Sequence, residues 1–384
     1  MNRRVFLATA AAGLAAAQQN DLPEPIRKLR PMLDGVVPIG EEERAARREK
    51  ARRLMAENKL DAIYLESGSS MYYFTGQRAA GQAAILAAKS KSEVVWTAAE
   101  AAKTAQALRD LGVATGKVGM EEQVRFATFE GLRRELPAVE CVSGTPVVAG
   151  CRVIKSPAEI ALLQRANDIT IEAYKAALAT MREGMTQREL SANISAAFRA
   201  LGTGGAAMAI FGKYTAFPHG SIQPQQLREG DMVLIDDGCN VEGYQSDITR
   251  TTVFGKPTKR QREVWDLERK AQDAALAAAK PGAACESVDA AARKVITDAG
   301  FGPGYKTPGL PHRTGHGIGL DGHEWTYLVK GNKTKMEPGM CFSNEPTIVI
   351  YGEFGVRLED CMYITPGGAR MFTKQSPAID QPFG

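Results

Sequence analysis

The sequence predicts an α+β protein with two domains, a smaller α/β domain followed by a larger one. At 384 residues the chain is long enough for two ordinary cores. Up to about residue 150, short apolar strands ("AAILAA", "EVVWTA") alternate with helical stretches ("EAAKTAQALRDLG"), as in a small α/β domain. From Met232 onward, strands separated by glycine turns dominate, with a helix between them. We therefore expect domains at residues 21–150 and 151–384.

Residues 1–20 predict a signal peptide rather than part of the fold. "MNRRVFLATAAAGLAAAQQN" joins Arg3 and Arg4 to a short apolar run that ends in small residues. The Arg-Arg-x-Phe-Leu order resembles a twin-arginine signal, which is read by a route that exports folded proteins. The run is too short for a mature membrane span, so we expect no stable membrane insertion. We expect export to the periplasm, and a cytoplasmic location if this alanine-rich start is retained instead.

The overall charge gives no reason to expect a nucleic acid partner, because the net charge is only +4. The six cysteines form no CxxC pair and no regular framework. Exported proteins can carry disulfides, but a chain of this size does not need them. We therefore expect the cysteines to be buried free thiols.

Two helix starts are visible in the sequence. "EEERAARREKARRLMAENKLDAIYL" opens the first domain with a charged helix, in which Glu43 and Arg47, like Glu49 and Arg53, are four residues apart. The interleaved acidic residues favour a solvated face over a basic recognition helix. "SPAE" at 156–159 is a capping box with proline at the first helical position, and it predicts the start of a long helix.

Two aspartates fall on one face of a predicted β-hairpin. "MVLIDDGCNVEGYQSDITRTTVF" predicts a strand, a turn at "EG" and a returning strand, which places Asp236 opposite Thr249 and Asp247 opposite Gly238. Because side chains alternate along a strand, Asp236 and Asp247 share a face, with Cβ atoms on the order of 7 Å apart, while Asp237 points away. Two carboxylates at that separation can converge on ions between them. The alternative is that they flank the turn in solvent, and "EG" is a weaker turn signal than Asn-Gly.

A second acidic pair occurs in "MCFSNEPTIVI", "YGEFG" and "VRLEDCMYIT", which predict a strand, a turn and a strand. Glu345 and Glu359 interrupt otherwise apolar strands, and an ionised carboxylate is costly to bury unless it is paired or binds a metal. Arg357 and Glu359 share one face by the same alternation. The alternative is an Arg–Glu surface pair on an edge strand, without function.

Three of the four histidines, His312, His316 and His323, gather in "HRTGHGIGLDGHE". The glycines favour a loop or an irregular strand, although His312 and His316 have helical i,i+4 spacing. "HE" begins like the HExxH zinc motif, but tyrosine stands where the second histidine should be, which excludes that motif. A single histidine would more often be a core residue, whereas three between two acidic hairpins indicate a metal or acid–base site. The fourth, His219, lies in "FPHGS".

These motifs together resemble one enzyme family. In order they are Asp-x-Gly, Ser-Asp-Ile-Thr-Arg-Thr, Gly-His-Gly-Ile-Gly-Leu, Asn-Glu-Pro and Arg-Leu-Glu-Asp. The set resembles the metallopeptidases of the pita-bread fold, and most closely their Xaa-Pro branch, prolidase and aminopeptidase P. The resemblance covers the second domain from "IKSPAEIALLQRAND" to "VRLEDCMYIT". In the first domain, "SSMYYFTGQR" is less specifically similar to the creatinase-like N-terminal domain of that branch.

The resemblance implies a site for two divalent metal ions. Its ligands would be Asp236, Asp247, His316, Glu345 and Glu359, with Asp247 and Glu359 bridging the ions. Four carboxylates would balance two divalent cations, and oxygen-rich ligation with one nitrogen suits Mn²⁺, with Co²⁺ or Zn²⁺ as alternatives. The nearby cysteines could be extra ligands, but we expect them to pack in the core. No ligand position departs from the family pattern, which argues against a non-catalytic relative.

The implied chemistry is hydrolysis of an Xaa-Pro bond by a hydroxide that bridges the two ions. Glu345 would accept the proton, while His219 and His323 would donate to the substrate carbonyl or its developing oxyanion. His312 would shape the pocket that receives proline, and Arg357 would orient the substrate.

Several activities share this pattern. We expect a dipeptidase acting on Xaa-Pro dipeptides, because the histidine stretch resembles that form slightly more than aminopeptidase P, which takes longer peptides. Methionine aminopeptidase lacks a first domain of this kind, and creatinase, a metal-free hydrolase of the same fold, should have lost carboxylate ligands. A binding module without catalysis should show altered ligand positions. The resemblance also implies a homodimer that acts on proline-containing di- or short peptides.

Overall fold

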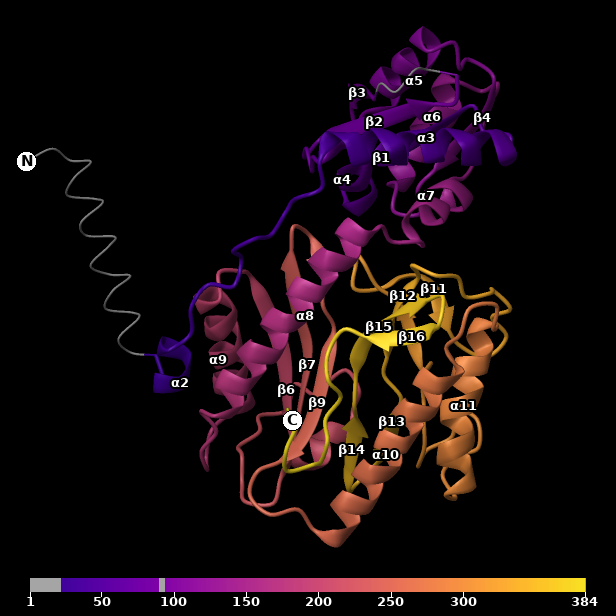
Figure 1. The fold of residues 1–384 in the computed structure, drawn as a ribbon. Helices are drawn as coiled ribbons and strands as arrows, with labels where there is room; N and C mark the ends of the chain where they lie inside the picture. Colours follow the sequence, from indigo (N-terminus) through magenta and orange to yellow (C-terminus); the bar gives the residue numbers. More distant parts are fainter. Residues whose placement is uncertain (1–21, 90–93, 384) are drawn as a thin grey trace, which may run out of the picture. The chain divides into compact units, whose positions relative to one another are not determined.

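The computed structural model describes residues 22–89 and 94–383, which form two compact units (Figure 1). The predicted signal peptide lies outside the described residues. The smaller unit is Val37–Glu159, and the larger unit joins residues 22–36 to residues 160–383. Among the helices of these described segments, none is both long and apolar enough to cross a membrane.

The described residues before Val37 belong to the larger unit because their backbone is bonded to it. Helix α2 is Glu24–Arg27, and the N–H of Met32, shortly after it, donates to the carbonyl of Leu201 (2.9 Å). The carbonyl of Met32 in turn accepts from the Arg165 guanidinium (2.6 Å). The predicted first domain, residues 21–150, is wrong for residues 22–36, because the hydrogen bonds to Leu201 and Arg165 join segments that are far apart in the sequence.

A five-stranded mixed sheet forms the centre of the smaller unit. Its order is β3-β2-β1-β4-β5, with β1, β4 and β5 parallel and the pairs of β2 antiparallel. The strands are β1 Ala62–Glu66, β2 Gln82–Ala87, β3 Val95–Ala98, β4 Gly116–Met120 and β5 Val139–Ser143. The helices are α3 Glu41–Glu57, α4 Ser69–Thr75, α5 Ala101–Asp110, α6 Phe126–Glu135 and α7 Thr145–Arg152. The predicted α/β class of this unit is confirmed.

The predicted solvated face of α3 is wrong for three of its arginines. Arg47, Arg48 and Arg52 are only 6%, 7% and 8% exposed. Arg47 and Arg48 donate to the carbonyls of Tyr73 (3.0 Å) and Phe74 (2.8 Å) at the end of α4. The last carbonyls of a helix have no partner within it, and these two guanidinium groups supply one. The sequence pattern shows which residues are charged but not that a neighbouring helix ends against them.

The larger unit contains five helices and eleven strands among its described residues. Its helices are α2, α8 Pro157–Leu178, whose first turn belongs to the smaller unit, α9 Gln187–Ala200, α10 Lys259–Ala278 and α11 Cys285–Asp298, with a 3₁₀ turn at Gly212–Ala216. Its first strands are β6 Gly205–Phe211, β7 Met232–Val241, β8 Tyr244–Gln245 and β9 Ile248–Val253. The later strands are β10 Gly315–Gly317, β11 Glu324–Leu328, β12 Cys341–Asn344, β13 Thr347–Ile350, β14 Phe354–Arg357, β15 Asp360–Thr365 and β16 Gly368–Met371.

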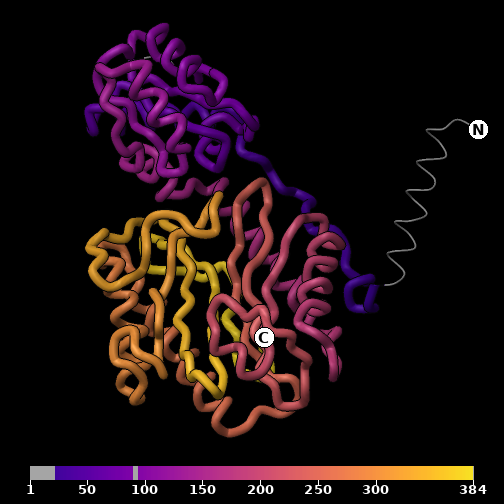
Figure 2. The backbone as a smooth tube through the Cα atoms, turned by 180° about the vertical axis from the view of Figure 1, so that it is seen from behind, coloured from indigo at the N-terminus to yellow at the C-terminus, as the bar shows by residue number. Residues whose placement is uncertain are grey.

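The larger unit is built from two halves, each of which combines two helices with β-strands. In Figure 1, α8 and α9 lie beside β6, β7 and β9, whereas α10 and α11 lie beside the later strands. The later strands form one sheet of order β11-β10-β12-β15-β16 and a separate hairpin, β13-β14. Strand β9 contacts both β14 and β15, so the two halves meet along these strands, as the tube in Figure 2 also shows.

Side-chain caps begin the main helices of this unit. At the start of α8 the Ser156 hydroxyl accepts from the Glu159 N–H (3.2 Å), and the Ser156 N–H donates back to the Glu159 carboxylate (2.9 Å). The predicted capping box is therefore confirmed. Thr186 and Thr258 begin α9 and α10 in the same way. Helix α11 follows Ala284 without a side-chain cap, and the sequence analysis did not identify it.

Candidate metal centre

The first predicted hairpin has the expected register. Strands β7 and β9 are antiparallel and place Asp236 opposite Thr249. The turn between them lies at Glu242 and Gly243, whose φ angles of 51° and 86° are both left-handed, as in the turns that match strand twist. Asp236 shares a cavity with Asp247, the other aspartate assigned to this face, so the alternative of two solvated turn residues is excluded.

The second acidic pair lies in a gap between two sheets. Asn344 pairs with Asp360 on β12 and β15, and Thr347 pairs with Arg357 on β13 and β14. The predicted single strand pair is therefore divided in two, because Pro346 has no N–H to continue the ladder. Glu345 and Glu359 occupy the gap, one on each side.

The backbone of both glutamates is fixed by other elements. The N–H of Glu359 donates to Thr249 O (3.1 Å) on β9, and the N–H of Glu345 donates to Thr314 O (2.9 Å). Glu359 is 1% exposed and Arg357 is 4% exposed, so the alternative of a surface Arg–Glu pair is excluded. The interrupted strands thus bring two carboxylates from the C-terminal half to the aspartates of the first half.

His316 lies on β10 with one ring nitrogen directed at the carboxylates. Its Nδ1 is 3.0 Å from the carbonyl of Gly317, which can only accept, so Nδ1 carries the hydrogen. Its Nε2 therefore presents a lone pair, 3.2 Å from Glu345 and 3.6 Å from Asp247. Burial lowers the pKa of His316 to about 4, which keeps the ring neutral. A neutral imidazole with a fixed tautomer is the form that binds a metal.

These side chains line one cavity of about 410 Å³. All of the site residues predicted from the sequence are at its wall, together with Arg313 and Val329, which the sequence analysis did not identify as site residues. The complete lining is His219, Asp236, Asp247, His312, Arg313, His316, His323, Val329, Glu345, Arg357 and Glu359.

The carboxylates of this cavity have too few hydrogen-bond donors and positive charges around them to balance their negative charge. Burial, followed by the neighbouring Asp236 and Glu345, raises the pKa of Asp247 well above its usual value. Burial and Asp247 do the same to the pKa of Glu359, and its buried Oε1 has no hydrogen-bond partner in the described structure. Acidic groups crowded in this way are stabilised by cations.

The donor set fits two cations. Ligand atoms of Asp236, Asp247 and Glu359 lie within 4.8 Å of one another, and so do those of His316, Glu345 and Glu359. Both groups include Glu359, whose two carboxylate oxygens could each bind one cation. Divalent cations such as Mn²⁺ favour carboxylate oxygens with a single imidazole. The five predicted ligands therefore lie close enough together to hold divalent cations.

Thr249 and Arg357 connect the acidic residues. The Arg357 guanidinium donates to the Asp236 carboxylate, to the Thr249 hydroxyl (3.0 Å) and to the carbonyl of Pro218 (3.1 Å). The Thr249 hydroxyl lies between Asp236 and Glu359 (2.7 Å to Glu359) and can donate to only one of them at a time. The predicted register placed Thr249 opposite Asp236, but no motif marked its role.

The remaining histidines lie around the metal ligands. His323 stacks on His316, with ring centroids 3.7 Å apart, and its Nδ1 accepts from Arg313 (2.7 Å). Its Nε2 must therefore carry the ring hydrogen, which makes that atom a donor rather than a metal ligand. Nε2 of His312 is 3.0 Å from the Thr347 hydroxyl.

A buried ion pair on α11 supports the loop that carries these histidines. Arg293 pairs with Asp289 (2.7 Å) and also donates to the carbonyls of Leu310 (2.9 Å) and His312. Asp289 accepts from the backbone N–H (3.1 Å) and the hydroxyl (2.8 Å) of Thr314. This pair was not predicted, because it lies on a helix outside the histidine motif.

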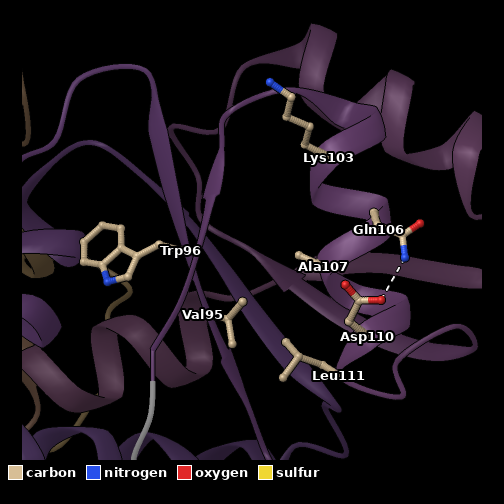
Figure 3. Close-up of a pocket in the computed structure, with 7 residues that line it drawn as sticks. All are labelled: Val95, Trp96, Lys103, Gln106, Ala107, Asp110 and Leu111. Carbon is tan, nitrogen blue, oxygen red and sulfur yellow. Dashed lines mark hydrogen bonds between the residues drawn. The ribbon is translucent and has the colours of Figure 1, made fainter.

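A second pocket, in the smaller unit, lacks the chemistry of a metal site. It has a volume of about 440 Å³ and lies between β3 and α5 (Figure 3). Its charged residues are Lys103 and Asp110, and Asp110 already accepts from Gln106 (2.8 Å). Trp96 and apolar side chains form the rest of its wall. We therefore assign the functional site to the cavity of the larger unit.

The cysteines take no part in the metal centre. All six are free thiols, and five are buried while Cys141 is partly exposed. Cys361 borders the site, and its Sγ donates to the carbonyl of Asp247 (3.1 Å). The grouped candidate ligands in the described residues include no cysteine, in agreement with the expectation of core packing.

Comparison with known proteins identifies the family. Residues 161–366 match metallopeptidase family M24, which is more than half of the chain. The chain belongs to this family. Residues 47–105 and 84–154 match the creatinase/prolidase N-terminal domain. The larger unit thus has the pita-bread fold of the M24 metallopeptidases, and the smaller unit has the creatinase-like fold that the sequence predicted.

Relatives in family M24 extend over both units. A Xaa-Pro dipeptidase from Pyrococcus furiosus is 30% identical over 344 residues, which is 85% of this chain and 97% of that relative. The structure of a dipeptidase from Pyrococcus horikoshii matches 85% of this chain and 98% of that one, with 28% identity and a TM-score of 0.79. An X-Pro aminopeptidase from Thermotoga maritima matches 86% of this chain and 98% of that one, with 25% identity and a TM-score of 0.76.

Proposed function

We propose that this M24 metallopeptidase is a Xaa-Pro dipeptidase. The observation that carries the proposal is the complete set of five predicted ligands around one cavity. It is supported by the Xaa-Pro dipeptidase from Pyrococcus furiosus, which aligns along almost its whole length. A metal-free creatinase-type hydrolase or a binding module would have no need of four carboxylates gathered in this way.

The proposed cofactor is a pair of divalent cations, Mn²⁺ in preference to Co²⁺ or Zn²⁺. Asp236, Asp247, His316, Glu345 and Glu359 would hold them. When bound, the ions would lower the pKa of a water molecule and polarise the scissile carbonyl. The preference for Mn²⁺ rests on the oxygen-rich donor set, in which no thiolate takes part.

Other residues of the cavity would bind substrate and move protons. Glu345 would accept the proton of the attacking water, and its carboxylate is oriented by the Ser343 hydroxyl (3.2 Å). Partial burial of the His323 ring, together with His316 and Arg313, lowers its pKa to about 4, so a neutral ring would donate from Nε2 to the carbonyl. His219, at the cavity wall, would be a second donor.

His312 and Arg357 would act mainly by position. Burial lowers the pKa of His312, and a neutral ring held by Thr347 can form part of the wall around a proline ring. The guanidinium of Arg357 is committed to Asp236, Thr249 and Pro218, so it would orient the substrate through these groups.

A substrate panel tests the proposed function. The purified protein, freed of metal and reloaded with Mn²⁺, should hydrolyse Ala-Pro faster than Ala-Pro-Ala and should not act on creatine. Treatment with a chelator should stop hydrolysis, and Mn²⁺ should restore it better than Co²⁺ or Zn²⁺. Hydrolysis of creatine without metal, or none of Xaa-Pro substrates, would contradict the proposal.

Xaa-Pro aminopeptidase activity on longer peptides is the second candidate. The observation in its favour is the similarity to the Thermotoga maritima X-Pro aminopeptidase over nearly that whole chain. A higher kcat/KM for Ala-Pro-Ala than for Ala-Pro in the same panel would select this activity.

We also propose that the protein is an exported homodimer. Export is supported by Arg3 and Arg4 before a short apolar run, and the dimer by the resemblance to the Xaa-Pro branch. Cell fractionation should find the protein in the periplasm, and replacing both arginines by lysine should retain it in the cytoplasm. Sedimentation equilibrium should give twice the chain mass.

A further inference from the structure

Thr249 joins the two halves of the larger unit at the acidic cluster. Its side chain is fully buried, and its hydroxyl contacts the carboxylate of Asp236 on β7 and that of Glu359 (2.7 Å), the residue before β15. Its carbonyl also accepts from the N–H of Glu359 (3.1 Å). One residue of β9 therefore fixes both the backbone and the side chain of Glu359 relative to the strand that carries Asp236.

The single hydrogen of this hydroxyl is most useful to Glu359. Nε of Arg357 donates to the hydroxyl oxygen (3.0 Å), so the hydroxyl's own hydrogen is free to point to a carboxylate. Asp236 already accepts from the Arg357 guanidinium. In the described structure Oε1 of Glu359 has no hydrogen-bond partner, and its Oε2 faces Thr249. Donation from Arg357 also polarises the hydroxyl, which strengthens its bond to the next acceptor.

We propose that the Thr249 hydroxyl is the positioning group that allows Glu359 to bind two cations. The hydrogen bond holds Oε2 on the side of Asp236 and leaves Oε1 without a protein partner. Glu359 belongs to both groups of candidate ligands, one with Asp236 and the other with His316 and Glu345. A carboxylate can bridge two ions only if its plane is held so that each oxygen faces one of them. Without the hydroxyl, the carboxylate is free to turn and bind a single cation with both oxygens.

The proposal rests on the proposed function, because it concerns the same pair of cations, and it adds a residue outside the ligand set. Thr249 acts through Glu359 and contacts neither substrate nor metal. Its loss should therefore weaken metal binding while the groups that carry out hydrolysis stay in place. An excess of Mn²⁺ should then restore activity, which it would not do if the residue served only to stabilise the fold.

The test is calorimetric titration of the metal-free protein with Mn²⁺. The wild type should bind two ions. Thr249→Val has nearly the same shape without the hydroxyl, and it should bind the weaker of the two ions about tenfold or more less tightly than the wild type does. Thr249→Ser keeps the hydroxyl and should bind both ions almost as the wild type does. The kcat/KM of Thr249→Val for Ala-Pro should rise with the Mn²⁺ concentration towards the wild-type value.

Thr252→Val is the matched control, because Thr252 is a buried threonine of the same strand whose hydroxyl donates to the carbonyl of Ile379 (2.6 Å). Three positions from Thr249, it is on the opposite face of the strand. It should lower the stability of the metal-free protein but leave both Mn²⁺ affinities unchanged.

Wild-type affinities in Thr249→Val, or equal losses of affinity in Thr252→Val, would overturn the proposal. If Thr249→Val does not fold, Thr249→Ala also lacks the hydroxyl and is measured in its place, with the same expected loss and the same contradicting result. Failure of the wild type to bind two Mn²⁺ ions would instead refute the metal pair of the proposed function itself.

Discussion

The two units of the chain bury charged groups in opposite ways. In the smaller unit three arginines of α3 are buried, and carboxylates of the same helix pair with them, as Glu43 does with Arg47 (2.8 Å) and Glu49 with Arg52 (2.7 Å). In the larger unit, the cavity gathers four carboxylates, and Arg357 is the only one of its cations that pairs with a carboxylate in the described structure. The buried arginines of α3 are thus neutralised by carboxylates of the protein, whereas the carboxylates of the cavity are not all neutralised by its cations.

This difference separates structural charges from functional ones. A buried ion pair needs nothing further, and its residues are explained by the groups they contact. The larger unit also has such a pair, Arg250 with Asp360 (2.7 Å), both of which are fully buried. It lies directly behind Glu359, whose carbonyl accepts from Arg250 (2.8 Å). The incomplete cluster is thus supported by a complete one, and the unbalanced charge marks the place for cations.

The largest effect should come from removing one carboxylate of the incomplete cluster. Asp247→Asn is expected to abolish hydrolysis of Ala-Pro, a loss well beyond the ~100-fold upper end for residues that only support a metal ligand. The reason is that the family resemblance makes Asp247 a ligand of both ions, and its carboxylate lies beside Asp236 and Glu359 and 3.6 Å from Nε2 of His316. The measurement is kcat/KM together with the metal content of the purified variant.

Asp237→Asn is the matched control for this prediction. Asp237 is adjacent to Asp236 on β7, but its side chain is exposed and accepts from the N–H of Gly238 (3.0 Å), which asparagine can also do. Its activity and metal content should stay at the wild-type level. Equal losses of activity and metal in both variants would show that hydrolysis depends on the negative charge of the region and not on the position of Asp247. The comparison between the two units would then fail.

Much of this site could be predicted because hairpin pairing is a local property. The turn at Glu242 and Gly243 fixes the register, and the register fixes which aspartates share a face. The acidic residues near Pro346 were also predictable as a pair, since buried carboxylates are costly. That they occupy a gap between two sheets was not, because it depends on hydrogen bonds to β9 and to the histidine loop.

The residues that support the site could not be predicted from the sequence, for the same reason. Asp289 and Arg293 act on His312 and Thr314 across a long stretch of sequence. Arg313 lies within the quoted histidine motif, but its exposure and its unbalanced charge are properties of the folded cavity. Local sequence patterns predict faces and turns, whereas the completeness of a charged cluster depends on which distant segments meet.

An intermediate effect is expected on the stability of the metal-free protein. After chelation, Glu359→Gln should unfold about 2–4 °C above the metal-free wild type, the shift that corresponds to ~1 kcal/mol in a unit of this size. The change removes the charge of one of four repelling carboxylates and can place an amide NH2, a donor among acceptors, where the buried Oε1 has no hydrogen-bond partner. With Mn²⁺ present the order should reverse, because the wild type gains binding free energy that the variant loses.

Thermal unfolding followed by circular dichroism measures both states. Glu353→Gln is the control, because Glu353 is half exposed and pairs with Arg260 on the surface (3.3 Å). It should not raise the stability of the metal-free protein. A metal-free Glu359→Gln variant that unfolds below the metal-free wild type would mean that the cluster is not repulsive, and the contrast with the smaller unit would be lost.

The smallest effect on activity should come from the complete pairs of the smaller unit. Arg47→Met removes hydrogen bonds to Glu43 and to the carbonyl of Tyr73, as well as the contact of the guanidinium with the Tyr73 ring (4.0 Å). It should lower the free energy of unfolding by about 2 kcal/mol, the typical value for hydrogen bonds to a charged group. Arg53→Met, at an exposed position on the same helix, should change it by less than ~0.5 kcal/mol.

Activity decides whether these arginines are purely structural. Every residue of the metal cavity belongs to the larger unit. The kcat/KM of Arg47→Met, per folded molecule, should therefore stay within about twofold of the wild type. A lost catalytic contact would instead lower kcat/KM by about tenfold for each 1.36 kcal/mol. Urea unfolding and Ala-Pro hydrolysis on the same preparation separate the two quantities. A loss of activity without a loss of stability would mean that α3 contributes to catalysis, and a complete ion pair could then no longer be taken as a sign of a structural role.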